Sequence, residues 1–523
     1  MVKCVSECKL FSKSECTQKE HCAYTNGNKM KYCRLSHDYI MNPPRCNITR
    51  RLKKKDVDHK PSVNIPVNKS VNIPVNKSVN IPANKSVKKS VNIPAKKSVK
   101  KSVNKRVNSP DFFLNIICPN TGMCIAFGNN SDLLTQYFNG FTDFSYALSP
   151  ITQIAKGENG FIYEILYNKD GYAASSILKS SQKPSSDNLL YEYVVGTKYV
   201  NQITKIFPCF VETYGLYYYD KPASWRLFSN KTTCPVSNLR HLILQNNVNY
   251  AKGCTESNYA ACLIQHVPNA ISLKDACRSP LFTTHDLVYM LFIVYHALST
   301  ISTAYTHYDL HYGNVLIYTL PSKSCIEYNY HYLDGTTRTF LSAYLPKIID
   351  YGRSYFNNGT EYSRQFYNTL CNTRECDPNC GVRVGFSWLD PVESYGISSI
   401  KKNESHDLRL LSQLGRMLHS TSLPGFAFNE LQDILLMYTI YGVGLKPGEK
   451  PIYGTTENLT PTTFNIGTKT PIYNVTGAYT ALKYIIDNPA TINQNQYRYA
   501  VLQKIGNLHI YEDGRPMNYD KII

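Results

Sequence analysis

The chain has 523 residues, enough for roughly two to four domains with a large hydrophobic core. Its net charge of +19 is uneven: residues 1–110 hold 25 lysines and arginines and 6 acidic residues, whereas residues 111–523 have no net charge. This distribution excludes the C-terminal part as a generally basic, polyanion-binding domain. Any attraction to nucleic acid, membrane or acidic protein is expected in the N-terminal part.

Targeting signals are not visible in the sequence. No segment reaches the ~18 to 20 apolar residues that a bilayer-spanning helix needs. The N-terminal M-V-K-C-V-S-E-C-K lacks the apolar centre of a secretory signal. We therefore expect a soluble, intracellular protein without a membrane span, in which most of the 17 cysteines are reduced.

Residues 1–49 are predicted to form a Cys-rich N-terminal module. Six cysteines share this short region with His21 and His37: Cys4, Cys8, Cys16, Cys22, Cys33 and Cys46. Such density indicates a small module held by zinc or by disulfides. The spacing matches no zinc template, and the redox compartment decides between the two alternatives, so both remain open and no ligands are assigned.

Residues 50–109 are predicted to be a low-complexity basic repeat linker. The unit S-V-N-I-P recurs from Ser62, Ser70, Ser78 and Ser90. Each repeat has one Ile and one Pro but no aromatic residue, too little apolar area to offset the entropy of ordering the chain. We expect a disordered, extended cationic linker. It could contact a polyanion, but the lack of aromatic residues for base stacking favours a spacer.

Residues 111–199 are predicted to contain strands and a helix that carry glycines, a lysine and a glutamate. Residues 111–149 are aromatic and are expected to pack on the domain that follows. The segment I-A-K-G-E-N-G-F-I-Y contains Gly157, Gly160 and Ile162, and the strand-like S-S-I-L-K ends at Lys179. A helical run over 189–199 carries Glu192, the best partner for Lys179. A solvated helix glutamate remains the alternative.

A buried strand and a buried helix are predicted further along. The apolar run 259–265 indicates a strand that leads into Gln265-His266-Val267, after a surface insertion over 220–258. Apolar residues then recur at helical spacing from Leu287 to Ile301. This helix leads directly into the most informative part of the sequence.

That part is T-H-Y-D-L-H-Y-G-N, Thr306 to Asn314, followed by an apolar run and later by Ile349-Asp350-Tyr351-Gly352. An isolated H-x-D is common by chance. An Asn at the right offset, a following strand and a downstream D-x-G make chance a poor explanation. The order H-x-D-x-x-x-x-N, then D-x-G, resembles the protein-kinase superfamily.

The resemblance implies an enzyme that transfers the γ-phosphoryl group of ATP with Mg²⁺ as cofactor. Asp309 would be the catalytic base facing the acceptor hydroxyl. Asp350 and Asn314 would be the metal ligands, since magnesium prefers oxygen. His307 would orient the loop rather than act as an acid or base.

The resemblance also implies a nucleotide-binding half. Lys179 would hold the α and β phosphates, oriented by Glu192. Gly157, Gly160 and Ile162 match the end of G-x-G-x-x-G-x-V, although Ala155 replaces the first glycine. Backbone groups from Gln265 to Val267 would contact adenine.

Two departures from the family bear on mechanism. Tyr308 replaces the arginine that pairs with a phosphorylated activation segment, so we expect activity without that phosphorylation. His311 stands where serine/threonine kinases carry lysine, and D-L-H-x-x-N is similar to the loops of aminoglycoside and choline phosphotransferases. A small-molecule phosphotransferase and a nucleotide-binding pseudokinase scaffold therefore remain alternatives.

The later sequence adds four expectations. A β-hairpin around Asp334-Gly335 would fill the long interval between Asn314 and Asp350. Asp407 sits where kinases place a helix aspartate that binds the catalytic-loop backbone. Residues 408–523 look mostly helical. Three cysteines after Gly352 would bind zinc or stay free: Cys371, Cys376 and Cys380.

The expected fold is α+β: a bilobal kinase-like domain over 110–523, with a β-rich N-lobe to about residue 266 and a mainly helical C-lobe from about 267. The pattern resembles serine/threonine protein kinases of large cytoplasmic DNA viruses, which implies a place in host cytoplasm or virion. Protein serine or threonine is the expected acceptor. The substrate and the oligomeric state are left open.

Overall fold

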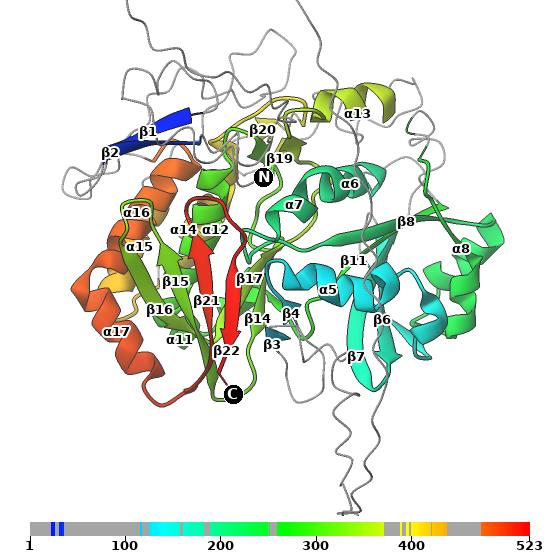
Figure 1. The fold of residues 1–523 in the computed structure, drawn as a ribbon, viewed down its shortest axis with the longest axis horizontal. Helices are drawn as coiled ribbons and strands as arrows, with labels where there is room; N and C mark the ends of the chain where they lie inside the picture. Colours follow the sequence, from blue (N-terminus) through cyan, green and yellow to red (C-terminus); the bar gives the residue numbers. More distant parts are fainter. Residues whose placement is uncertain are drawn as a thin grey trace, which may run out of the picture. The chain divides into compact units, whose positions relative to one another are not determined.

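A computed structural model describes residues 22–26, 31–35, 116–117, 125–156, 160–181, 189–248, 250, 259–370, 387–389, 394–396, 399–419, 421–436 and 472–522. Over these ranges the chain is a mixed α+β structure (Figure 1). Contacts divide the chain into two units, Met1–Pro44 with Ser109–Ile523, and Arg45–Asn108. The predicted linker lies outside the described residues. Of the Cys-rich module, only the backbone of the antiparallel pair β1 (Cys22–Asn26) and β2 (Lys31–Leu35) is described.

The largest sheet is seven-stranded, antiparallel and curled. Its strands, in spatial order, are β10 (Leu242–Leu244), β8 (Thr213–Tyr219), β11 (Ala260–Gln265), β7 (Tyr172–Ser181), β6 (Gly160–Lys169), β5 (Ile151–Lys156) and β9 (Thr233–Cys234). Burial alternates along β6, as expected where successive side chains point to opposite faces. On one face Phe161, Tyr163, Ile165 and Tyr167 are fully buried.

That face is covered by the aromatic segment before the sheet. Helix α5 (Asn130–Tyr137) leads into Phe138 and Phe141, whose rings stack 5.2 Å apart. Phe141 also lies edge-on to Tyr167 at 5.3 Å, and its carbonyl accepts a hydrogen bond from the Tyr167 hydroxyl. The prediction that residues 111–149 pack on the following domain is confirmed for the part that the structure describes. Upstream, β3 (Ile116–Ile117) pairs with β4 (Ile125–Ala126).

The opposite face of the sheet packs on α6 (Leu189–Val195), which continues as a π-helical turn, Gly196–Val200, and α7 (Asn201–Ile203). The predicted surface insertion, residues 220–258, also contributes to the hydrophobic core. Its helix α8 (Pro222–Ser229) buries Phe228 completely, with the ring edge-on to Tyr163 at 5.6 Å.

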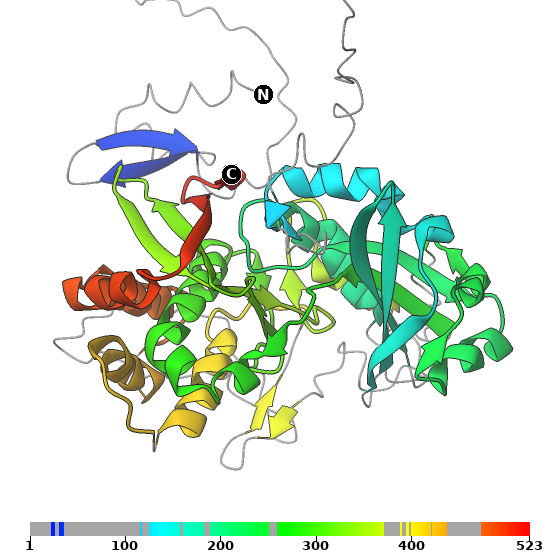
Figure 2. The same cartoon turned by 90° about the horizontal axis from the view of Figure 1, so that it is seen from below.

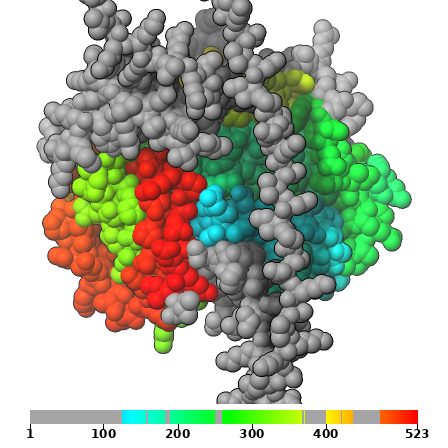
Figure 3. All heavy atoms as spheres, in the orientation of Figure 1, coloured from blue at the N-terminus to red at the C-terminus, as the bar shows by residue number. Residues whose placement is uncertain are grey.

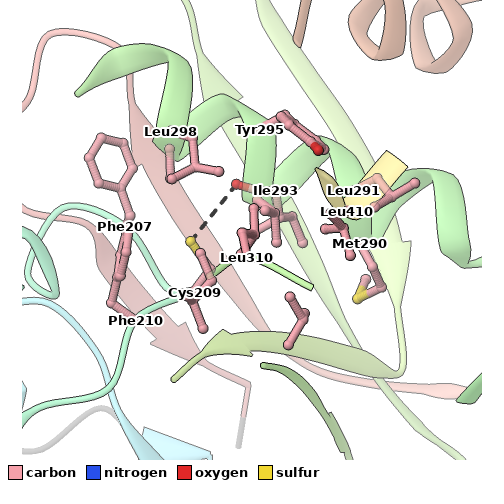
Figure 4. Packing of buried hydrophobic residues seen from close by; sticks show 14 of the residues in the cluster. Phe207, Cys209, Phe210, Met290, Leu291, Ile293, Tyr295, Leu298, Leu310 and Leu410 are labelled. Carbon is pink, nitrogen blue, oxygen red and sulfur yellow. Dashed lines mark hydrogen bonds between the residues drawn. The ribbon is translucent and has the colours of Figure 1, made fainter. Parts of the chain in front are cut away.

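Helix α12 (Leu287–Thr300) occupies the centre of the second half, as predicted. Twelve of its residues, from Leu287 to Leu298, are buried, because a helix that is apolar on all sides has no face for water. Figure 4 shows Phe207 and Cys209 lying against Ile293 and Leu298, where the Cys209 thiol donates to the Ile293 carbonyl oxygen. This packing joins the loop before β8 to α12.

Short elements around α12 flank the segments Thr306–Asn314 and Ile349–Gly352. Two helices precede it: α10 (Leu273–Ala276) and α11 (Pro280–His285). A three-stranded sheet consists of β12 (Ile271–Ser272), β14 (Val315–Thr319) and β17 (Tyr344–Ile348). Beside it β13 (Tyr305–Thr306) pairs with β18 (Tyr355–Phe356). After these come α13 (Ser363–Leu370) and the pair β19 (Ser387–Leu389) and β20 (Ser394–Gly396).

The predicted hairpin is confirmed as β15 (Ser324–His331) and β16 (Thr337–Ser342). Residues 408–523 are helical over α14 (Arg409–Leu418), α15 (Phe426–Leu436), α16 (Val475–Asp487) and α17 (Pro489–Tyr499). The prediction of a mostly helical end was wrong for the last part. There β21 (Gln503–Tyr511) and β22 (Asn518–Lys521) extend the hairpin into a four-stranded sheet, with β21 parallel to β15. Helix α17 lies against β16 (Figures 1 and 2).

The C-terminal strands also contact the segment that precedes the seven-stranded sheet. In the space-filling view the red surface of β21 and β22 lies beside the cyan surface of the segment with α5 (Figure 3). The rings of Phe127 and Tyr519 are 5.5 Å apart, and the Met517 N–H donates to the Lys205 carbonyl oxygen at 2.9 Å. Gly128 has φ +57°, and a Cβ there would lie 2.1 Å from the Met517 carbonyl oxygen, so only glycine fits.

Two further expectations concern membranes and thiols. Among the described helices, none has the length and apolarity to cross a bilayer. The cysteines whose side chains are described are buried thiols that form no disulfide with one another: Cys209, Cys234, Cys262, Cys277 and Cys325. Cys371, Cys376 and Cys380 lie outside the described residues.

Candidate functional site

The loops that carry Asp309 and Asp350 leave neighbouring strands. β14 follows directly after Asn314 and pairs with β17, Val315 opposite Ile348. The Ile349 N–H then donates to the Asn314 carbonyl oxygen at 3.0 Å. The two segments are thus joined by backbone hydrogen bonds directly before Asp350 and five residues after Asp309.

Asp407 fixes the backbone of the Thr306–Asn314 loop. Its two carboxylate oxygens accept from the N–H groups of His307 and Tyr308, at 2.7 and 2.9 Å. Burial raises the pKa of Asp407 to about 7, against the effect of these two donors. Tyr308 has φ +65° and Asp350 has φ +68°, conformations that cost energy for residues other than glycine. The predicted contact of Asp407 with this loop is therefore present.

His307 orients the loop through both ring nitrogens. Nδ1 accepts from the Asp309 N–H at 3.2 Å, which leaves Nε2 to donate to the Ile349 carbonyl oxygen at 3.0 Å. Burial lowers the pKa of His307 to about 4, so the ring is neutral at pH 7. This geometry suits the predicted orienting role and offers no proton donor or acceptor to a substrate.

Lys179 lies between two carboxylates. Its ammonium nitrogen is 2.6 Å from Glu192 and 3.0 Å from Asp350. Burial would lower the pKa of Lys179, but Asp350 and Glu192 together raise it, so the ammonium stays charged. Burial would raise the pKa of Asp350, but Lys179 lowers it. The predicted Lys179–Glu192 pair is present, and the solvated alternative for Glu192 is wrong because its side chain is 4% exposed.

The glycine-containing segment is only partly described. Gly157 lies outside the described residues. Gly160 begins β6, where a Cβ would lie 2.4 Å from the Ser180 carbonyl oxygen, so strand packing alone requires glycine. Ile162 lies directly opposite Lys179 in the β6–β7 register, so the two side chains lie on the same face of the sheet.

The end of β11 differs in detail from the expectation. The Gln265 N–H already donates to the Glu212 carbonyl oxygen at 2.8 Å, so it is not available to a bound base. The Val267 N–H has no acceptor among the described residues. The side chain of His266, for which the sequence predicted no role, has its Nδ1 2.9 Å from Ser175 Oγ and 3.2 Å from Glu164 Oε1. These contacts tie the residue after β11 to strands β6 and β7.

The tyrosine of the D-x-G triplet, Tyr351, uses its hydroxyl group to bind neighbouring backbone. Its buried hydroxyl accepts from the Val211 N–H at 2.9 Å and donates to the Ile348 carbonyl oxygen at 2.8 Å. The Ile348 N–H in turn donates to the Cys209 carbonyl oxygen. Ile348, two residues before Asp350, and Tyr351, directly after it, are therefore both anchored to the segment leading into β8.

Oxygen atoms suited to a hard cation are present. Asn314 Nδ2 donates to the Asp309 carbonyl oxygen at 3.0 Å, and its Oδ1 accepts no hydrogen bond from the described residues. The Asp350 side chain is 42% exposed. No group of three His, Cys, Asp or Glu side chains in the described ranges is arranged to hold a metal ion. A magnesium ion on nucleotide phosphates needs only one or two protein oxygens, so these two residues fit it.

Arg409 and His311 are the residues at Asp309 that sequence reasoning did not place. Arg409 Nη1 donates to Asp309 Oδ1 at 2.5 Å, and His311 Nε2 lies 3.9 Å from the same oxygen. The available signal was the position of Arg409 two residues after Asp407. Because Asp407 binds the loop backbone, residues of the same turn come close to Asp309.

Comparisons with known proteins add no identity. The chain matches no protein-family model. Curated proteins give no match either.

Proposed function

We propose that the chain is an ATP-dependent kinase with a bilobal kinase-like fold that phosphorylates serine or threonine of proteins. The observation that carries this proposal is the anchoring of Asn314 and Asp350 beside β14 and β17, with Asn314 Nδ2 bound to the Asp309 carbonyl oxygen. Lys179 is paired to Asp350. Phosphoryl transfer requires mainly positioned charges, which this arrangement offers.

In the proposed reaction Asp309 accepts the proton of the acceptor hydroxyl as that oxygen bonds to the γ-phosphorus. The bond from this phosphorus to the β–γ bridging oxygen breaks, and ADP leaves with the electron pair. Lys179 stabilises negative charge on the phosphates, oriented by Glu192. Mg²⁺, held by Asp350 and Asn314, would supply further charge neutralisation.

Two observations refine the proposal. Tyr308 is buried and donates its hydroxyl proton to the Lys401 carbonyl oxygen at 2.6 Å, so it offers no cation to a phosphorylated segment. This supports activity that is independent of such phosphorylation. A nucleotide-binding scaffold would not need a complete set of reacting groups. The set is complete here and supports catalysis: Lys179, Asp309, Asn314 and Asp350. A small-molecule phosphotransferase remains the second candidate because of His311 in D-L-H-x-x-N.

The test is turnover of labelled ATP with Mg²⁺ and generic protein substrates. Asp309→Asn should lower turnover about 100- to 10,000-fold, the usual contribution of a positioned base. Asp487→Asn is the matched control, because Asp487 also pairs with an arginine, Arg338, at 2.6 Å but lies outside the loop. Phosphate transfer to small alcohols without labelled protein would favour the second candidate. Equal turnover of wild type and Asp309→Asn would refute catalysis.

A further inference from the structure

The carboxylate of Asp309 accepts a hydrogen bond from the guanidinium of Arg409, one hundred residues later in the chain. Arg409 is the first residue of α14, and its side chain is 9% exposed, against 26% for Asp309. Asp407, two residues earlier, binds the loop backbone, so one helical turn presents both side chains to the loop. A buried guanidinium in this place differs from a surface ion pair, whose contribution is small.

The histidines near Asp309 do not supply a positive charge. His311 Nδ1 accepts the Gly313 N–H at 3.0 Å, and His307 Nδ1 accepts the Asp309 N–H. A ring nitrogen that accepts a hydrogen bond carries no proton, so both rings are neutral in this geometry. Among the described residues, Arg409 is the one lysine or arginine paired with Asp309.

We propose that Arg409 is the positioning residue for Asp309: it fixes Oδ1 and leaves Oδ2 to the acceptor hydroxyl. This inference rests on the proposed phosphoryl transfer. Oδ2 has no partner among the described residues, which agrees with one oxygen being held and the other being presented. A guanidinium is always charged and its N–H groups have fixed directions, so it can orient a carboxylate at any working pH.

Substitutions of Arg409 test the assignment. Arg409→Ala should lower kcat about 100-fold, since a misplaced reacting group costs about that much. It should leave the Kd for ATP, measured by calorimetry, within twofold, because Lys179 and Asp350 remain. Arg409→Lys should restore part of kcat. Arg338→Ala, which removes a partly buried arginine from Asp487, is the matched control and should keep kcat within twofold.

Two readouts separate positioning from a merely structural role. Because Arg409 acts through Asp309, Arg409→Ala should lower the residual kcat of Asp309→Asn less than threefold, a strongly non-additive result. Guanidinium chloride at low millimolar concentration should raise kcat of Arg409→Ala several-fold and leave Arg338→Ala unchanged.

Three outcomes would overturn the inference while wild-type turnover remains. These are an Arg409→Ala kcat within twofold of wild type, an increase in kcat that marks Arg409 as a restraint, and a loss that is additive with Asp309→Asn and not rescued by guanidinium. Absent turnover in the wild type, equal to that of Asp309→Asn, would instead remove the proposed function and this inference with it.

Discussion

Two buried aspartates, Asp407 and Asp286, have raised pKa values. Asp407 serves the loop backbone, as described above. Asp286 is fully buried before α12 and accepts a short hydrogen bond from the Tyr499 hydroxyl. Burial raises the pKa of Asp286 to about 7. Because Asp286 does not contact the loop around Asp309, its titration should appear in stability without a direct effect on turnover.

Asp286→Asn should reduce the pH dependence of stability between about pH 4 and 7. In the unfolded chain an aspartate releases its proton near pH 4, whereas the folded protein keeps it until about pH 7. The folded state therefore binds more protons across this window, and the free energy of unfolding falls as pH rises. Each pKa unit corresponds to about 1.4 kcal/mol. Urea unfolding at several pH values measures the slope.

The exposed Asp513 is the control for this titration. Asp513→Asn removes one acidic group of the same type outside the buried site, so the change in slope at Asp286 is judged against it. The comparison between variants cancels other groups, including His307, whose lowered pKa makes stability rise with pH between about 4 and 6.5. Equal slopes for wild type and Asp286→Asn would mean that Asp286 is ionised in the folded protein.

At the scale of elements, the C-terminal strand β21 closes the hairpin sheet. It pairs in parallel with β15 from Ser324 to His331 and buries Leu508 and Ile510 completely. Leu508→Ala should lower the free energy of unfolding by about 2 to 5 kcal/mol, the cost of a cavity in a packed core. Chemical denaturation measures this change.

Val501 provides the matched control, because it precedes β21 and is 86% exposed. Val501→Ala should change the free energy of unfolding by less than about 0.5 kcal/mol. A Leu508→Ala variant as stable as Val501→Ala would mean that β21 does not pack as described.

The predictability of these elements follows the range of the interactions that form them. Helix α12 and the β15–β16 hairpin were predictable because an apolar period and an Asp-Gly turn are local signals. β21 was not, because its partner β15 lies far back in the sequence and a short alternating segment after two helices does not indicate a sheet by itself. The burial of Phe228 within a segment predicted as a surface insertion has the same origin.

The candidate site divides in a similar way. The positions of Asp309, Asn314, Asp350, Lys179 and Glu192 followed from motif spacing, and the structure brings the Lys179–Glu192–Asp350 contacts together. Arg409 could not be assigned to Asp309 from spacing, because the contact depends on how α14 begins beside the loop. Gly160 had the right identity, but strand packing against Ser180 explains it without a ligand.

At the scale of the whole molecule, charge and the candidate site belong to different parts of the chain. Residues 45–108 contain 18 lysines and arginines and 2 acidic residues, whereas residues 111–523 have no net charge. This basic segment is the separate unit Arg45–Asn108. Affinity for polyanions and phosphoryl transfer should therefore be separable.

A variant without residues 50–109 should keep the melting temperature and ATP turnover of the full chain but lose retention on heparin. Electrostatic attraction to a polyanion arises from counterion release, so retention of the full chain should fall steeply as salt rises. A full-length variant with the lysines of residues 50–109 replaced by glutamine keeps the length but removes the charge, and it should elute with the deletion. If both variants bind heparin like the full chain, the polyanion contact lies outside residues 50–109. If the deletion alone lowers the melting temperature, the spacing between the flanking parts, rather than charge, is what this segment contributes.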